Sequence, residues 1–175
     1  MDRRLFVFFL ANALLIFLQA LVNHRLAPLS VSVFVPGLML ILAPLYLRPL
    51  SGLLCLVLSG LWLDAAMPGL PFGFSMIVFV TLGLFIRHYR NRFQPQQNFH
   101  PLLLALLSNA LWLLAVGFFA GRGQLLDWIY QLRFWSDFLL SQLVLLAIAV
   151  WFFNLQRSAL YLLGWKTVPE ELPLA

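Results

Sequence analysis

Long apolar runs separated by short polar stretches dominate the pattern of this chain. Residues 5–22 are almost entirely apolar and follow Arg3 and Arg4. Five further apolar runs cover residues 29–47, 50–66, 72–86, 102–120 and 134–153. An α-helix needs about 20 apolar residues to cross a bilayer. The pattern therefore predicts an all-α fold in which six transmembrane helices form one membrane domain over residues 1–175.

The first two runs differ in regularity. Residues 5–22 are long for the apolar part of a signal peptide, and no small-x-small cleavage site follows, so we expect an uncleaved helix. The second run contains Pro36-Gly37 and Pro44. Prolines predict a kinked or discontinuous helix. Lipid tolerates such a break only where neighbouring helices satisfy the freed backbone groups.

Two shorter segments have an apolar face and a polar face. In residues 124–133, Trp128, Ile129 and Leu132 share one face, whereas Gln124 and Asp127 lie on the other. This pattern predicts a separate interfacial helix lying on the membrane. Residues 154–175 begin in the same way, and we expect a membrane-surface C-terminal tail that is helical to about residue 165.

The composition identifies an integral membrane protein. Hydrophobic residues make up 63% of the chain and charged residues only 10%, against about 25% charged residues in soluble domains. The net charge of +5 is typical of a nucleic-acid binder. However, the basic residues occur in short clusters between apolar runs, which favours contacts with anionic lipid and a role in topology.

Charge also predicts the orientation. With six spans and a cytoplasmic N-terminus, eight of the eleven basic residues fall on the inner side. This distribution follows the positive-inside rule, so we expect both termini in the cytoplasm. Three of the inner residues form a basic patch that could bind phosphate headgroups or an acidic partner: Arg87, Arg90 and Arg92. Their role in topology alone would explain them.

Small residues recur three or four positions apart along the third run, so they lie on one helix face. They are Ser51, Gly52, Cys55, Ser59 and Gly60, with Asp64 one turn further on. In lipid, such a face lets another backbone approach closely. We therefore expect a packing or partner interface here, together with Pro36 and Gly73.

The outer side combines three acids with three bases, which suggests an ion-paired rim. Its members are Arg25, Arg122, Arg133, Asp64, Asp127 and Asp137. One interpretation is an outward-opening pocket for an ion or substrate. The other is a lock between helix ends or a rim where a partner docks. The second is favoured, because no charge lies in the middle of a span and transport acids usually lie deeper.

Uncharged polar residues occur within the spans: Asn12, Gln19, Ser59, Thr81, Ser108, Asn109 and Gln142. Their usual role is hydrogen bonding between helices, although a ligand pocket that includes Trp62 and Trp112 is an alternative. His24, His88 and His100 lack the spacing of a metal site, and Cys55 is the single cysteine. We expect no cofactor, no metal and no catalytic residue, and therefore a protein that is not an enzyme.

Several of these residues form a pattern that resembles the MreD family of rod-shape-determining proteins. The matching positions are Pro36, Tyr46, Gly60-Leu61-Trp62-Leu63-Asp64, Gly73, Phe134-Trp135-Ser136 and the basic C-terminus. The resemblance implies a non-enzymatic component of the bacterial inner membrane. Such proteins act in cell elongation and peptidoglycan synthesis with the bitopic protein MreC, MreB filaments, RodA and penicillin-binding protein 2.

The resemblance also implies a compact bundle similar to the substrate-binding subunits of energy-coupling-factor transporters. We therefore expect a scaffold whose small-residue face and outer rim hold MreC. The alternative is a solute-binding transport subunit with an outward pocket near Asp64, Asp137 and Asn109. The first run argues against it, because Ala11, Ala13 and Ala20 are not spaced four apart as docking alanines of those subunits are. A lipid-modifying enzyme is a third possibility.

Overall fold

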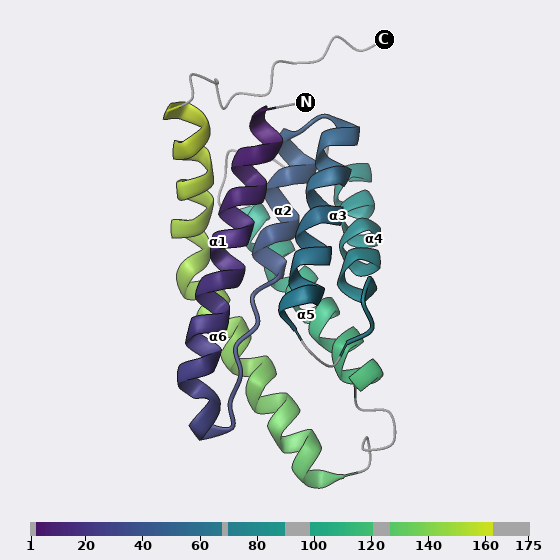
Figure 1. The fold of residues 1–175 in the computed structure, drawn as a ribbon, viewed down its shortest axis with the longest axis vertical. Coiled ribbons are helices and arrows are strands. Elements are labelled where there is room, and N and C mark those ends of the chain that lie inside the picture. The colour runs from purple at the N-terminus through teal and green to yellow at the C-terminus, as the bar shows by residue number, and fades with distance from the viewer. Residues whose placement is uncertain (1–2, 68–69, 90–98, 121–126, 163–175) are drawn as a thin grey trace.

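Helices make up nearly all of the computed structural model, which describes residues 3–67, 70–89, 99–120 and 127–162 (Figure 1). No strand occurs within these ranges. The elements are α1 (Arg3–Leu26), the short 3₁₀ helix η1 (Ala27–Leu29), α2 (Gly37–Tyr46), α3 (Pro49–Ala66), α4 (Phe74–His88), α5 (Phe99–Ala120) and α6 (Trp128–Leu162). The all-α class predicted from the apolar runs is confirmed for the described residues.

Helix α2 is the central element of the bundle. It packs against each of the other five α-helices, and every residue from Gly37 to Leu45 is buried. Its composition explains this position, because these nine residues include no charged side chain and present an apolar surface on all sides. Successive helices, α2 included, run alternately in opposite directions, so that α1 begins and α6 ends at the same end of the bundle (Figure 1).

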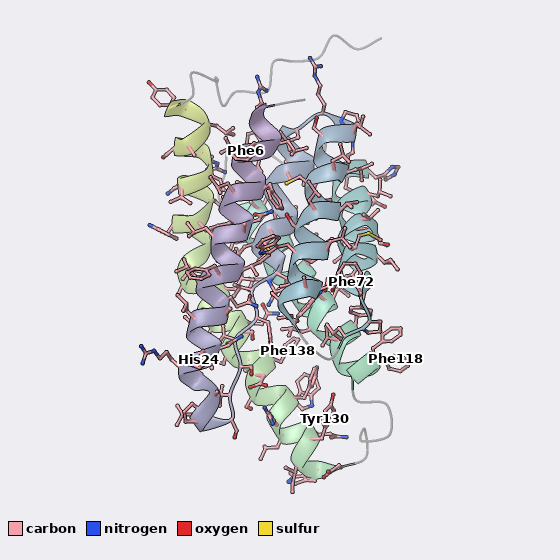
Figure 2. The ribbon with its side chains drawn as sticks, in the orientation of Figure 1. Phe6, His24, Phe72, Phe118, Tyr130 and Phe138 are labelled. Atoms are coloured by element: carbon pink, nitrogen blue, oxygen red, sulfur yellow. The ribbon has the colours of Figure 1, made fainter. Side chains whose placement is uncertain are left out.

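Four helices, α1, α3, α5 and α6, are long and apolar enough to cross a membrane, whereas α2 and α4 are shorter apolar helices. The outside of the bundle is apolar as well. Figure 2 shows Phe6 on α1 and Phe118 on α5 directed away from the bundle, and both side chains are exposed. Water would not favour such a surface, but the hydrocarbon of a bilayer does. These features indicate a membrane-embedded protein.

The second apolar run is discontinuous, as its prolines predict. Residues 31–35 are neither helix nor strand, and α2 begins only after Pro36. Pro44 lies inside α2 without ending it. Leu47 is extended at the end of α2, and Pro49 occupies the first turn of α3, where the missing N–H of proline costs no helical hydrogen bond.

Helix α6 corrects two expectations. A separate interfacial helix at residues 128–133 is wrong, and so is a new helix after residue 153, because both segments belong to one helix of 35 residues. Residues 128–162 contain neither proline nor glycine to break it. At 1.5 Å per residue α6 is about 52 Å long, more than the hydrocarbon thickness of about 30 Å. Its first half leans away from the bundle (Figure 1). Residues 124–126 and 163–175 lie outside the described part.

Candidate functional site

The segment Ser30–Pro36, which we call the clamped segment, lies between helices without a backbone partner strand. In a membrane, each of its N–H and C=O groups needs a hydrogen-bond partner, because an unsatisfied group in hydrocarbon costs several kcal/mol. Polar side chains from three helices supply these partners. The structure thereby brings together several of the polar residues that the sequence places inside the spans.

Helix α1 contributes Asn23 and Gln19. Asn23 Nδ2 donates to the carbonyl oxygen of Val33 at 2.9 Å, and its Oδ1 accepts from the N–H of Val33 at 2.8 Å. The side-chain amide thus pairs with the backbone as a neighbouring strand would. One turn earlier, Gln19 Oε1 accepts from the N–H of Val35 at 3.0 Å. The four-residue spacing of Gln19 and Asn23 places both on the same face of α1.

Helices α5 and α6 contribute the remaining partners. Asn109 spans the break: its Oδ1 accepts from the N–H of Gly37 at 3.1 Å, and its Nδ2 donates to the carbonyl oxygen of Phe34 at 3.1 Å. On α6, Ser141 Oγ accepts from the N–H of Phe34 at 2.9 Å. One turn away, Asp137 Oδ1 accepts from the N–H of Ser32 at 3.0 Å. Asp137 therefore holds the backbone of this segment.

Asp64 joins the end of α3 to the start of α4. Its Oδ2 accepts from the N–H of Gly73 at 2.9 Å, and its Oδ1 accepts from the N–H of Ser75 at 2.9 Å. Gly73 precedes α4 with a φ of 95°, a left-handed conformation that favours glycine. The carboxylate satisfies N–H groups at a helix N-terminus, where the helix dipole also favours a negative charge. This geometry fits the helix-end lock rather than an open ion site.

We expect Asp64→Asn to lower the free energy of unfolding by about 1–3 kcal/mol. The amide NH₂ would replace one carboxylate oxygen and face a backbone N–H, so one buried donor would lose its acceptor. Unfolding by denaturant in detergent micelles measures the change. Asp127→Asn is the control. Asp127 is exposed and accepts from the N–H of Ile129 at the start of α6. Asparagine is an equally good N-cap, so this substitution should leave stability unchanged. Equal stability of the Asp64→Asn variant and the wild type would contradict the lock.

The small-residue face of α3 packs inside the chain. A Cβ on Gly60 would lie 2.6 Å from Met76 Cα, and one on Gly52 would lie 3.3 Å from the carbonyl oxygen of Ala43, so α4 and α2 approach closely here. Cys55 and Ser59 are buried on the same face, whereas Ser51 is partly exposed. The expectation that this face holds the transmembrane helix of a partner is therefore wrong, because helices of the same chain already fill it.

Buried polar side chains also connect helices to one another directly. Asn12 Nδ2 donates to Ser59 Oγ at 2.9 Å, and Gln156 Nε2 donates to Asn12 Oδ1 at 3.2 Å, so one network joins α1, α3 and α6. Trp112 Nε1 donates to Ser75 Oγ at 3.2 Å between α5 and α4. Asn12 and Ser59 thus make the kind of helix–helix contact expected of them from the sequence, whereas the roles of Gln156 and Ser75 were not predicted.

The predicted outer rim does not form ion pairs among the described residues. Each of the three carboxylates at this end accepts from backbone N–H groups instead. Arg25 and Arg133 are exposed, and Arg122 lies outside the described residues. In the predicted inner basic patch, Arg87 Nη1 donates to the carbonyl oxygen of Leu47 at 3.4 Å. Arg90 and Arg92 also lie outside the described part.

A cavity of about 620 Å³ opens beside the clamped segment, between α1, α5 and the end of α3. We call it the α1–α3 cavity. Its lining includes Gln19, Ala20, His24, Phe34, Ala66 and Trp112. Neither Asp64 nor Asp137 nor Asn109 lines it, so the pocket expected near those residues lies instead beside Gln19 and His24. The sequence could have located this cavity, because the spacing of Gln19, Asn23 and His24 predicts one polar face at the end of α1.

The arrangement offers hydrogen bonding and close packing rather than reactive groups. Within the described ranges, no cluster of three or more histidine, cysteine or acidic side chains could hold a metal ion. The described hydrogen bonds of Asn109, Ser141, Asp137 and Asp64 go to the backbone of the same chain. Comparison of the chain with protein-family models, curated proteins and solved structures gave no match.

Proposed function

We propose that this chain is a non-enzymatic scaffold of the bacterial cell-elongation machinery, related to the MreD family that its sequence resembles. In this proposal it crosses the inner membrane six times, has both termini in the cytoplasm, and binds a bitopic protein such as MreC. RodA, penicillin-binding protein 2 and MreB filaments are further candidate partners. The use of polar side chains for internal hydrogen bonds supports a scaffold over an enzyme.

The distribution of charge supports the proposed orientation. Arg4, Arg48, Arg87 and Arg157 belong to helix ends or turns at the end of the bundle where α1 begins. Arg25 and Arg133 belong to the opposite end. By the positive-inside rule, the end that carries more basic residues faces the cytoplasm.

One observation carries the scaffold proposal: the first half of α6 presents an unpacked apolar row. The row consists of Trp128, Leu132, Trp135, Leu139 and Leu143, all of them exposed. Their spacings of three and four place them on one helix face, as in the seam of a helix pair. Because α6 exceeds the membrane thickness and leans outward, this row suits a partner that has one transmembrane helix and an outer domain.

Site-specific photo-crosslinking in the native membrane tests this surface. A photo-reactive amino acid at Leu139 is expected to crosslink to the bitopic partner. The same amino acid at Leu107 on α5 is the control, because both positions are apolar and 61% exposed but lie on different helices. Crosslinking from Leu107 but not from Leu139 would contradict the assignment of the row as the partner surface.

The second candidate is a solute-binding subunit of a membrane transporter, and the α1–α3 cavity is the observation that favours it. Its volume of about 620 Å³ lies within the range of about 300–1,000 Å³ that ligand pockets occupy. A water-soluble molecule that co-purifies with the chain and raises its melting temperature would favour this function over the scaffold.

A further inference from the structure

The α1–α3 cavity opens on an apolar flank of the molecule. Three lining residues are exposed, namely Ala20 and His24 on α1 and Ala66 on α3, and they mark its mouth. One turn from them, Phe17 on α1 and Trp62 on α3 are also exposed. In a bilayer such side chains contact acyl chains, so the mouth lies where lipid has direct access.

The cavity also contains an unused hydrogen-bond donor. Gln19 lines it and is only 7% exposed. The backbone N–H of Val35 can only donate, so the atom of Gln19 that faces it must be the oxygen. The NH₂ group therefore points elsewhere, and it donates to no described residue. A donor that has no protein acceptor and belongs to a mostly buried side chain lining a cavity is available to a ligand oxygen.

The rest of the lining favours a hydrocarbon body. Phe34 and Trp112 contact each other with ring centroids 6.0 Å apart, and both line the cavity. The polar atoms of Asn23 are used by Val33, and the indole N–H of Trp112 is used by Ser75. At the mouth, His24 and its neighbour Arg25 occupy the last turn of α1 and are exposed, which suits a phosphate group outside the cavity.

We propose that this cavity binds one acyl chain of a glycerophospholipid from the surrounding leaflet. An ester carbonyl oxygen of the lipid accepts from the NH₂ group of Gln19, and the phosphate lies by His24 and Arg25. Lipid then fills a space that would otherwise leave Gln19 unsatisfied beside the clamped segment. This site is independent of the apolar row on α6 and goes beyond the scaffold proposal.

Tryptophan fluorescence in bilayers tests whether an acyl chain enters. Trp112 is 1% exposed, so chains outside the bundle do not contact it. In a variant that keeps Trp112 and carries phenylalanine at the other five tryptophans, we compare bilayers of dioleoylphosphatidylglycerol with bilayers of its bromine-labelled form. We expect the bromine-labelled chains to quench Trp112. Ala66→Phe narrows the mouth and should restore the fluorescence.

The control is Ala65→Phe, since Ala65 is an exposed neighbour on α3 that does not line the cavity. It should leave the quenching unchanged. Absence of bromine-dependent quenching, or quenching that Ala66→Phe does not reduce, would overturn the proposal. Quenching of Trp112 by aqueous acrylamide without quenching by brominated chains would also overturn it, in favour of a water-soluble ligand.

Native mass spectrometry of the wild-type chain tests the Gln19 contact without any substitution. Delipidated protein is titrated with phosphatidylglycerol carrying ester-linked chains and with the matched ether-linked lipid, which lacks the carbonyl oxygen. Loss of one hydrogen bond predicts about twofold to tenfold weaker binding of the ether lipid. Equal binding of both lipids, or no retention of either, would overturn the assigned contact.

Discussion

Replacing Asn109 by leucine is expected to lower the free energy of unfolding by about 2–6 kcal/mol. The side chain is fully buried and bonds to two backbone groups, the N–H of Gly37 and the carbonyl oxygen of Phe34. Leucine has the same number and branching of side-chain heavy atoms but neither donor nor acceptor, so both groups would remain unsatisfied, at about 1–3 kcal/mol each. Unfolding in mixed micelles, followed by helix content, measures the loss.

Two further substitutions make this result specific. In its protonated form, Asn109→Asp keeps an acceptor for Gly37 and an O–H donor for Phe34, so we expect a smaller loss of stability than for Asn109→Leu at a pH where the new carboxyl group is protonated. Leu107→Ala on the exposed side of the same helix should change stability by less than about 0.5 kcal/mol. If Asn109→Leu unfolds like the wild type, the side chain does not hold the helix break.

Gly60→Ala is expected to destabilise the fold by about 1–3 kcal/mol, and Gly60→Leu by more. A Cβ at this position would lie 2.6 Å from Met76 Cα and 2.8 Å from Met76 N. These are backbone atoms of α4 that cannot move aside by a rotamer change, so α3 and α4 would have to separate. The melting temperature in detergent and the yield of folded, monodisperse protein measure the effect.

Ala65→Leu is the matched control for Gly60→Leu, because Ala65 is exposed on the same helix and should accept the larger side chain. In both variants, each folded molecule should bind as much of the bitopic partner as the wild type does, since Gly60 faces α4. A Gly60→Leu variant that is fully folded but no longer co-purifies with the bitopic partner would contradict the internal role and restore the partner interface.

Apolar length and proline position made much of the fold predictable. The apolar runs at residues 50–66 and 102–120 correspond closely to α3 (Pro49–Ala66) and α5 (Phe99–Ala120). The break at Pro36-Gly37 follows from the fixed φ and missing N–H of proline. The extent of α6 was less predictable, because an amphipathic turn at residues 128–133 has the same periodicity whether it lies on the membrane or continues into a span.

The partners of the polar residues could not be predicted from spacing. Spacing shows which residues of one helix share a face, but Asn109 bonds to residues 72 and 75 positions away, and Ser141 to a residue 107 positions away. The small-residue face of α3 was ambiguous for another reason. Small residues such as glycine and serine are needed for a close approach of two backbones whether the second helix belongs to the same chain or to a partner. Their presence therefore does not distinguish the two cases.

The clamped segment also sets an order for biosynthesis. Its hydrogen-bond partners Asp137 and Ser141 lie 105 and 107 positions further along the chain than Ser32 and Phe34. At about 5–20 residues per second, a ribosome delivers them several seconds after the segment itself has left the tunnel. Until α6 is in place, the N–H groups of Ser32 and Phe34 therefore lack these acceptors. A nascent chain arrested before α5 would be a substrate for membrane quality control rather than a stable smaller bundle.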